Sequence, residues 1–335
     1  MAYILGLPID VLNLFVKKMS LLDALHLISS HRYFENIPIH CLTSYTIDTK
    51  TLHQDKYEKV YDIDLAFNEN NVSVSFLTQL RKLNVCYSDY DQKDLDNVSN
   101  LVYLNISGNG SITNIAHLSL LTHLEIVGSS NNINIVSYLT NLTRLNLLGN
   151  KKITNISTLT QLIELKIRKT TITQSSINTL VNLTRLDVSD TKMINNISHL
   201  TRLTRLNAGF MTGAIGQNSI NNLSNLTHLN IYGNVDIISI SHLTSLTRLN
   251  IGSLYSKIDQ NSINMLSNLT HLSIFKNPHI TCISHLTLLN YLDARHTNCQ
   301  NDVTNLISLT SLRISRNDIN ISLLTDLQFL NDEKQ

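Results

Sequence analysis

Leucines recur along most of the chain in a fixed pattern, with polar residues between them. The unit is Leu-x-x-Leu-x-apolar, as in Leu101, Leu104 and Ile106. Its first leucine stands at positions 80, 101, 121, 142, 162, 183, 203, 226, 246, 269, 289 and 309, and a weaker unit begins at Val60. A spacing of about 20 to 23 residues is typical of proteins built from stacked repeats.

The alternation inside each unit predicts a short β-strand. Residues two apart on a strand share a face, so Leu104 and Ile106 point the same way while Tyr103 and Asn105 point to solvent. One repeat cannot bury such an apolar face alone. Neighbouring repeats bury it together when their strands stack about 4.8 Å apart. The pattern therefore predicts an α/β solenoid with a parallel β-sheet on its concave side.

A polar position completes each unit, three places after the last strand residue. It is occupied by Asn68, Asn109, Asn150, Asn234, Asn277 and Asn317, by Thr170, Thr191 and Thr297, and less suitably by Leu254. From about residue 58 to 330 the sequence resembles the leucine-rich-repeat family. The resemblance implies a solenoid that presents a long, non-catalytic binding surface. We expect the Asn column to satisfy buried backbone groups, and Thr to replace it only in part because it has one donor.

A second period doubles the first. Similar segments open at Gln92, Gln174, Gln217, Gln260 and Gln300, mostly two repeats apart. In these segments a Ser precedes Ile-Asn, as at Ser176, and we expect it to cap a short helix. The intervening repeats, such as ITNISTLTQL, are rich in β-branched residues, which favours extended or 3₁₀ backbone. The back of the solenoid should therefore alternate between the two.

Residues 1–45 depart from the repeat, which we expect to fill residues 46–335 with about 13 rungs. Apolar residues at helical spacing predict three short helices there. Such helices could serve only as a cap, since the open end of a solenoid needs covering. The segment also resembles an F-box, and the positions that carry the likeness are Leu7, Pro8, Asp10, Val11, Leu12, Phe15, Met19, Ser20, Asp23, Leu25, Leu27, Arg32 and Phe34.

The F-box resemblance implies a specific role. Leu7, Pro8, Val11, Leu12 and Phe15 would dock a Skp-type adaptor in a helix-in-groove mode, and the adaptor would link the chain to a cullin–RING ubiquitin ligase. The solenoid would then hold the protein to be ubiquitinated. The alternatives are a protein-interaction scaffold with no ubiquitin role, and a secreted adhesion module similar to the bacterial internalins. Two such resemblances in one chain, with high Asn and Ile usage, suit an AT-rich eukaryote or a large virus that infects one.

The outward strand positions form the predicted binding face. The first strand residue is basic in many repeats, notably at Arg144, Arg185, Arg205, His228, Arg248 and His271. Guanidinium groups grip carboxylate or phosphate oxygens in pairs. The column therefore suggests an acidic or phosphorylated partner segment. The alternative is a solvated face that was copied together with its LTRL repeat.

Composition narrows the remaining possibilities. The net charge is +1, only 15% of residues are charged, and no run of basic residues points to a nucleic-acid partner. Four scattered cysteines favour reduced thiols in the cytoplasm or nucleus, and the N-terminus is a poor secretion signal. No apolar run is long enough to cross a membrane. We find no catalytic motif, no cofactor motif and no spacing that suits a metal, so we expect a protein that is not an enzyme.

Overall fold

The computed structural model describes residues 42–43, 62–67, 75, 77–128, 136–210, 215–315 and 320–332. The chain divides into two compact units, Met1–Leu162 and Ile163–Gln335. The F-box-like residues Leu7, Pro8, Val11, Leu12 and Phe15 lie outside the described residues. The expected boundary near residue 45 lies outside them too, so both stay predictions.

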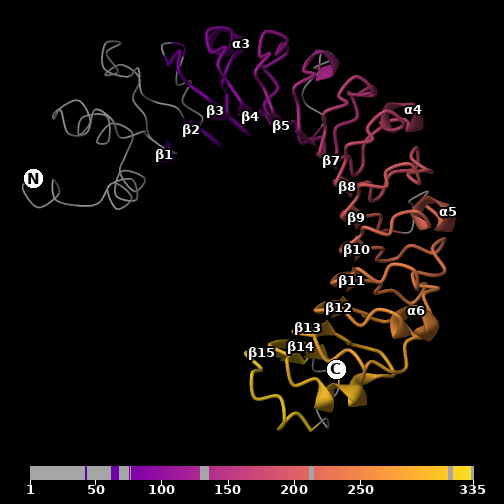
Figure 1. The fold of residues 1–335 in the computed structure, drawn as a ribbon. Helices are drawn as coiled ribbons and strands as arrows, with labels where there is room; N and C mark the ends of the chain where they lie inside the picture. Colours follow the sequence, from indigo (N-terminus) through magenta and orange to yellow (C-terminus); the bar gives the residue numbers. More distant parts are fainter. Residues whose placement is uncertain are drawn as a thin grey trace, which may run out of the picture. The chain divides into compact units, whose positions relative to one another are not determined.

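Each unit is a ladder of very short parallel strands in chain order (Figure 1). The first unit contains β1 (Leu42–Thr43), β2 (Asp62–Asp64), β3 (Lys82–Asn84), β4 (Tyr103–Asn105), β5 (His123–Glu125) and β6 (Arg144–Asn146). The second contains β7 (Glu164–Lys166), β8 (Arg185–Asp187), β9 (Arg205–Asn207), β10 (His228–Asn230), β11 (Arg248–Asn250), β12 (His271–Ser273), β13 (Tyr291–Asp293), β14 (Ser311–Ile314) and β15 (Phe329–Asp332). The predicted parallel-sheet solenoid is confirmed.

The core is a stack of leucine layers that follows from the register. The middle residue of each strand pairs with the middle residue of the next, as Leu229 pairs with Leu249 and Leu249 with Leu272. These side chains are at most 3% exposed, and so is Ile251, two residues further along. The strand residues on either side of the buried one face outward. One face of every repeat is thus buried against its neighbours, as the leucine spacing predicts.

The back of the solenoid alternates as expected. Helical turns follow alternate strands at α3 (Gln92–Leu95), η4 (Val136–Tyr138), α4 (Gln174–Ile177), α5 (Gln217–Ile220), α6 (Gln260–Asn264) and η5 (Gln300–Asn305). In the repeats between them, the described residues contain no helix on this side. In the second unit, α4, α5 and α6 lie on the side away from the strands (Figure 1).

The expected helix cap was wrong. Ser176 lies inside α4 and is buried, and the residue that precedes the helix is Thr173. In α6 the cap is Asp259, whose side chain accepts from the backbone N–H of Ser262. The helix α4 therefore begins three residues earlier than a cap at Ser176 would place it, at Gln174.

The glutamine at the first position of the helix joins each helical repeat to the extended repeat that follows. Gln174 Oε1 accepts from the backbone N–H groups of Asn195 and Asn196, both at 3.0 Å. Its Nε2 donates to the carbonyl oxygen of Asn196 at 2.7 Å. The same three contacts recur at Gln92, Gln217 and Gln260. The doubled period therefore has a structural role.

In the asparagine column, Asn109, Asn234 and Asn277 bond backbone groups of two repeats. Asn234 is 3% exposed, and its Nδ2 donates to the carbonyls of Ala208 and Ile215 in the preceding repeat. Its Oδ1 accepts from Asp236 and Ile237 in its own repeat. By contrast, the Thr191 hydroxyl donates only to the nearby carbonyl of Val188. Thr replaces Asn only in part, as expected.

A recurring histidine also has a structural partner. His117, His199, His242 and His285 place Nε2 3.1–3.3 Å from a carbonyl oxygen in the preceding helical repeat. Since a carbonyl oxygen only accepts, each ring donates from Nε2. These histidines stabilise the stacking of repeats.

Candidate binding groove

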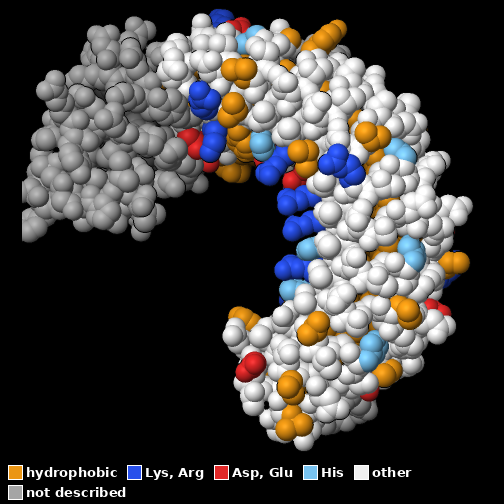
Figure 2. Space-filling model, viewed as in Figure 1, with side chains coloured by type: hydrophobic (Ala, Val, Ile, Leu, Met, Phe, Trp, Pro, Cys, Tyr) orange, Lys and Arg blue, Asp and Glu red, His pale blue; other side chains and the backbone are white. Residues whose placement is uncertain are grey.

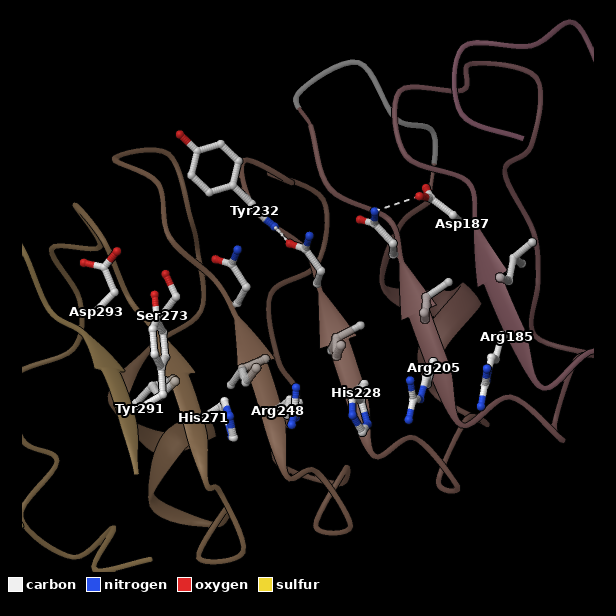
Figure 3. A pocket seen from close by; sticks show the side chains of 18 of the residues that line it. Arg185, Asp187, Arg205, His228, Tyr232, Arg248, His271, Ser273, Tyr291 and Asp293 are labelled. Atoms are coloured by element: carbon white, nitrogen blue, oxygen red, sulfur yellow. Dashed lines mark hydrogen bonds between the residues drawn. The ribbon is translucent and has the colours of Figure 1, made fainter. Parts of the chain in front are cut away.

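A single row of side chains crosses the open face of the second unit. Register pairs Arg185 with Arg205, Arg205 with His228, and His228 with Arg248. The row continues to His271 and Tyr291. Figure 3 shows the five Arg and His side chains side by side along one edge of the strands. Parallel pairing in register, with the same strand position used each time, produces this row.

The row lies in a groove of about 830 Å³ that crosses β7 to β14. We call it the strand groove. A second row, formed by the last residue of each strand, includes Asp187, Asn207, Asn230, Asn250, Ser273 and Asp293 (Figure 3). Tyr232 and Phe275 complete the lining beyond the strand ends. In Figure 2, blue Lys and Arg side chains alternate with pale-blue His along this inner face.

The groove is positively charged. Six cationic residues line it, namely Lys166, Arg185, Arg205, Arg248, Arg295 and Arg313, against the three carboxylates Glu164, Asp187 and Asp293. Two of the three carboxylates form ion pairs, and the third, Asp187, accepts hydrogen bonds from neutral groups. Glu164 Oε2 lies 3.4 Å from Arg185 Nη1, and Glu164 Oε1 lies 3.5 Å from Lys166 Nζ. Asp293 Oδ2 lies 2.9 Å from Arg295 Nη2. Asp187 accepts from Asn207 Nδ2 at 3.0 Å.

Arg205 and Arg248 differ from the other arginines of the row. Both side chains are exposed, and within the described part of the chain neither forms an ion pair or a hydrogen bond. Their strand neighbours in register are Arg185, His228 and His271, none of which carries negative charge. Two uncompensated guanidinium groups therefore face the groove, separated by one strand.

The two histidines of the row are held in a defined tautomer. The Thr227 hydroxyl donates to the carbonyl of Thr204 at 3.1 Å and lies 2.9 Å from Nδ1 of His228. Having used its one proton, the hydroxyl accepts from Nδ1–H. Thr270 and His271 repeat the arrangement. Nε2 is therefore the ring nitrogen left to gain a proton.

The environment of these histidines favours the neutral ring. The pKa of His228 is lowered from its usual 6.5, first by burial and then by the positive charges of Arg205 and Arg248. The pKa of His271 is lowered by burial and by Arg248. An anion bound in the groove would raise the pKa of both histidines, because it favours the charged ring.

The second row adds hydrogen-bond donors. Asn230 Oδ1 accepts from the backbone N–H of Tyr232, and Asn250 Oδ1 from that of Gly252, at 3.0 and 3.1 Å. These bonds orient each amide so that Nδ2 carries its two donors without a partner among the described residues. The groove thus offers cations in one row and amide donors in the other.

The structure brings together most of the predicted face. Arg185, Arg205, His228, Arg248 and His271 all line the strand groove. Arg144 is the exposed first residue of β6 in the first unit and does not line this groove. The described residues hold no cluster of three or more side chains that could bind a metal, and no helix among them could span a membrane.

Sequence reasoning missed the residues beyond the strand ends. The third residue after most of the described strands lies in the left-handed region, at Phe67, Tyr87, Gly108, Gly128, Gly149, Lys169, Asp190, Phe210, Gly233, Lys276 and His296. Glycine at four of these places was the available signal. The turn brings Tyr232 and Phe275 to the edge of the groove.

Comparisons agree on the fold. No protein-family model and no curated protein matches the sequence. Among solved structures, an internalin of Listeria monocytogenes is similar with a TM-score of 0.62 and 24% identity, over 85% of this chain and 90% of that one. The leucine-rich-repeat protein LIC12759 of Leptospira interrogans has a TM-score of 0.59 and 23% identity, over 84% and 80%. The TLR13–ssRNA13 complex has a TM-score of 0.50 and 18% identity, over 93% of this chain and 55% of that one. The chain has the leucine-rich-repeat solenoid fold.

Proposed function

We propose that the chain is a non-catalytic interaction scaffold that binds a segment of an acidic or phosphorylated protein in the strand groove. One observation carries the proposal. Arg205 and Arg248 are exposed in the groove and form no ion pair among the described residues, while Glu164 and Asp293 are ion-paired and Asp187 accepts hydrogen bonds from neutral groups. A bound carboxylate or phosphate would supply the missing charge and accept charge-assisted hydrogen bonds.

The shape of the groove also favours a polypeptide. It is an open trough crossed by consecutive strands, and donors from two rows face it along its length. An extended chain presents a carbonyl oxygen at every residue, which suits the Nδ2 groups of Asn230 and Asn250. The aromatic edge at Tyr232 and Phe275 offers apolar contact to side chains of the same segment.

Selection from a random peptide library tests the proposal without knowledge of the natural partner. Peptides selected on the intact chain should rebind it and lose at least about tenfold in affinity when Arg205→Glu and Arg248→Glu are combined. Arg202→Glu is the matched control, because Arg202 is an exposed arginine of the same repeat that does not line the groove and bonds Asn182. Selected peptides that bind both variants equally would place the binding surface elsewhere.

The ligase-adaptor reading rests on sequence alone. The F-box-like segment, with Leu12 and Phe15 at its expected docking face, is its one supporting observation. We predict co-purification with a Skp-type adaptor, abolished by Leu12→Asp and Phe15→Asp. A thermal melt must accompany these variants, since they could also loosen an N-terminal cap. If the intact chain captures no adaptor, the scaffold function stands without a ubiquitin role.

A further inference from the structure

We propose that the strand groove recognises an extended segment with acidic side chains at every third residue, and that binding takes up protons on His228 and His271. The inference rests on the proposed function and goes beyond it by stating the spacing of the anions and the pH dependence. Its site is the part of the groove where Arg205, His228, Arg248 and His271 stand in consecutive register.

The spacing follows from strand geometry. Arg205 and Arg248 lie on β9 and β11, with β10 between them. At about 4.8 Å per strand, their backbones are about 9.6 Å apart. A polyproline II segment rises about 9.3 Å over three residues, and its threefold symmetry returns every third side chain to the same face. One turn of such a segment therefore matches two strands.

Arginine and histidine alternate along this part of the row and have different roles in binding. With one carboxylate at Arg205 and the next at Arg248, the ring of His228 lies between them, and His271 follows beyond Arg248. When Nδ1–H is held by Thr227, protonation adds a proton at Nε2 and makes the ring a second cationic donor. The segment would then meet cations on four consecutive strands.

The charges around His228 set the sign of the pH effect. The groups that act on it are Arg205, Arg248, His271 and Arg185, all of them basic. In the free groove they disfavour a further positive charge, so the ring is neutral at neutral pH. Bound carboxylates reverse that field and raise the pKa. The bound state then holds more protons than the free state, and affinity rises as the pH falls toward and below 6.5.

The ends of the cationic stretch favour a short acidic segment over a long polyanion. On one side Arg185 is already paired with Glu164, and on the other Arg295 is paired with Asp293. A nucleic acid that continued along the groove would bring its phosphates to these carboxylates. An acidic peptide can place neutral residues there.

Two synthetic peptides of equal composition test the spacing. One repeats Glu-Pro-Pro over about twelve residues, and the other has its glutamates consecutive and its prolines together. Fluorescence anisotropy with the full chain should show the repeating peptide binding at least about fivefold more tightly. Arg205→Gln or Arg248→Gln should remove that preference, and Arg202→Gln should keep it. Equal binding of the two peptides overturns the spacing.

The same anisotropy titration at pH 7.5 and pH 5.5 tests the proton uptake, because glutamate stays mostly charged at both values. We expect affinity for the repeating peptide to rise at least about fivefold on acidification. The combined variant His228→Gln, His271→Gln should lose most of this rise while keeping the dependence on Arg205. A pH-independent affinity of the intact chain overturns the proton uptake.

Further outcomes distinguish a failure of this inference from a failure of the proposed function. A single-stranded RNA oligonucleotide that binds more tightly than the repeating peptide, and depends on Arg205, overturns the acidic-segment partner. If library-selected peptides depend on Arg205 and Arg248 but the Glu-Pro-Pro peptide does not bind, this inference fails and the proposed function survives. If neither kind of peptide depends on these arginines, the proposed function fails as well.

Discussion

At the scale of single residues, the strand groove is defined by which charges are compensated. Arg185 and Arg205 occupy equivalent strand positions, yet only Arg185 has a carboxylate within reach, because Glu164 precedes it by one strand. Arg205 follows an arginine instead. Whether the arginine of an LTRL motif has an ion-pair partner therefore depends on the residue at the same strand position one repeat earlier. Two identical motifs thus present one paired and one unpaired arginine.

The electrostatics of the row predict a measurable coupling. Arg248→Gln should raise the pKa of His228 toward 6.5, because it removes one of the two nearest positive charges that lower it. Because the pKa of His228 is lower in the folded chain than in the unfolded chain, this histidine lowers the free energy of unfolding as the pH falls below 6.5. The Arg248→Gln variant should lose less stability over the same pH range. An NMR titration of the ring resonances gives the pKa directly. Arg202→Gln should leave it unchanged, and an equal shift in that control would contradict local coupling.

The left-handed corner after β4 leaves no room for a side chain at Gly108. Gly108 has a φ of +69°, and a Cβ there would lie 2.3 Å from Cδ1 of Tyr87. Gly108→Ala should therefore destabilise the chain by about 1–3 kcal/mol, from backbone strain and displacement of the Tyr87 ring. Gly110→Ala is the matched control, because a Cβ there meets nothing within 4 Å. Chemical denaturation should separate the two. Equal stability of both variants would contradict the account of the turn.

At the scale of elements, helical and extended repeats are joined in pairs by side chains that bond backbone. The glutamine at the start of α4 and the histidine at position 199 both bridge from a helical repeat to the extended repeat after it. Short helices of four residues have little stability of their own. The doubled period is thus a stacking unit of two repeats.

Removal of one such glutamine tests its contribution. Gln174→Ala leaves two backbone N–H groups and one carbonyl of the next repeat to water, and we expect a loss of about 1–2 kcal/mol in unfolding free energy. Gln161→Ala is a suitable control, since Gln161 is exposed and has no bond among the described residues. A urea titration of both variants measures the difference. If Gln174→Ala unfolds like the control, the glutamine does not hold the repeats together.

At the scale of the whole molecule, the solenoid was predictable and the site only in part. The leucine period fixes which residues are buried and, through equal strand positions, which side chains form the row from Arg185 to His271. Contacts that depend on turn geometry were not predictable. Gly233 is a local signal for the left-handed corner beside Tyr232, but the place of Tyr232 at the groove and the reach of Gln174 across 22 residues have none. The pairing of Arg185 with Glu164 could have been derived from register.

Site-specific photo-crosslinking can show whether the strand groove is the binding surface. A photoreactive amino acid replaces Ser273, which lines the groove, or Met265, which is 56% exposed and does not line it. The probe is a peptide selected on the intact chain. We expect strong crosslinking from position 273 and only background from position 265. Crosslinking from 265 without 273 would contradict this expectation.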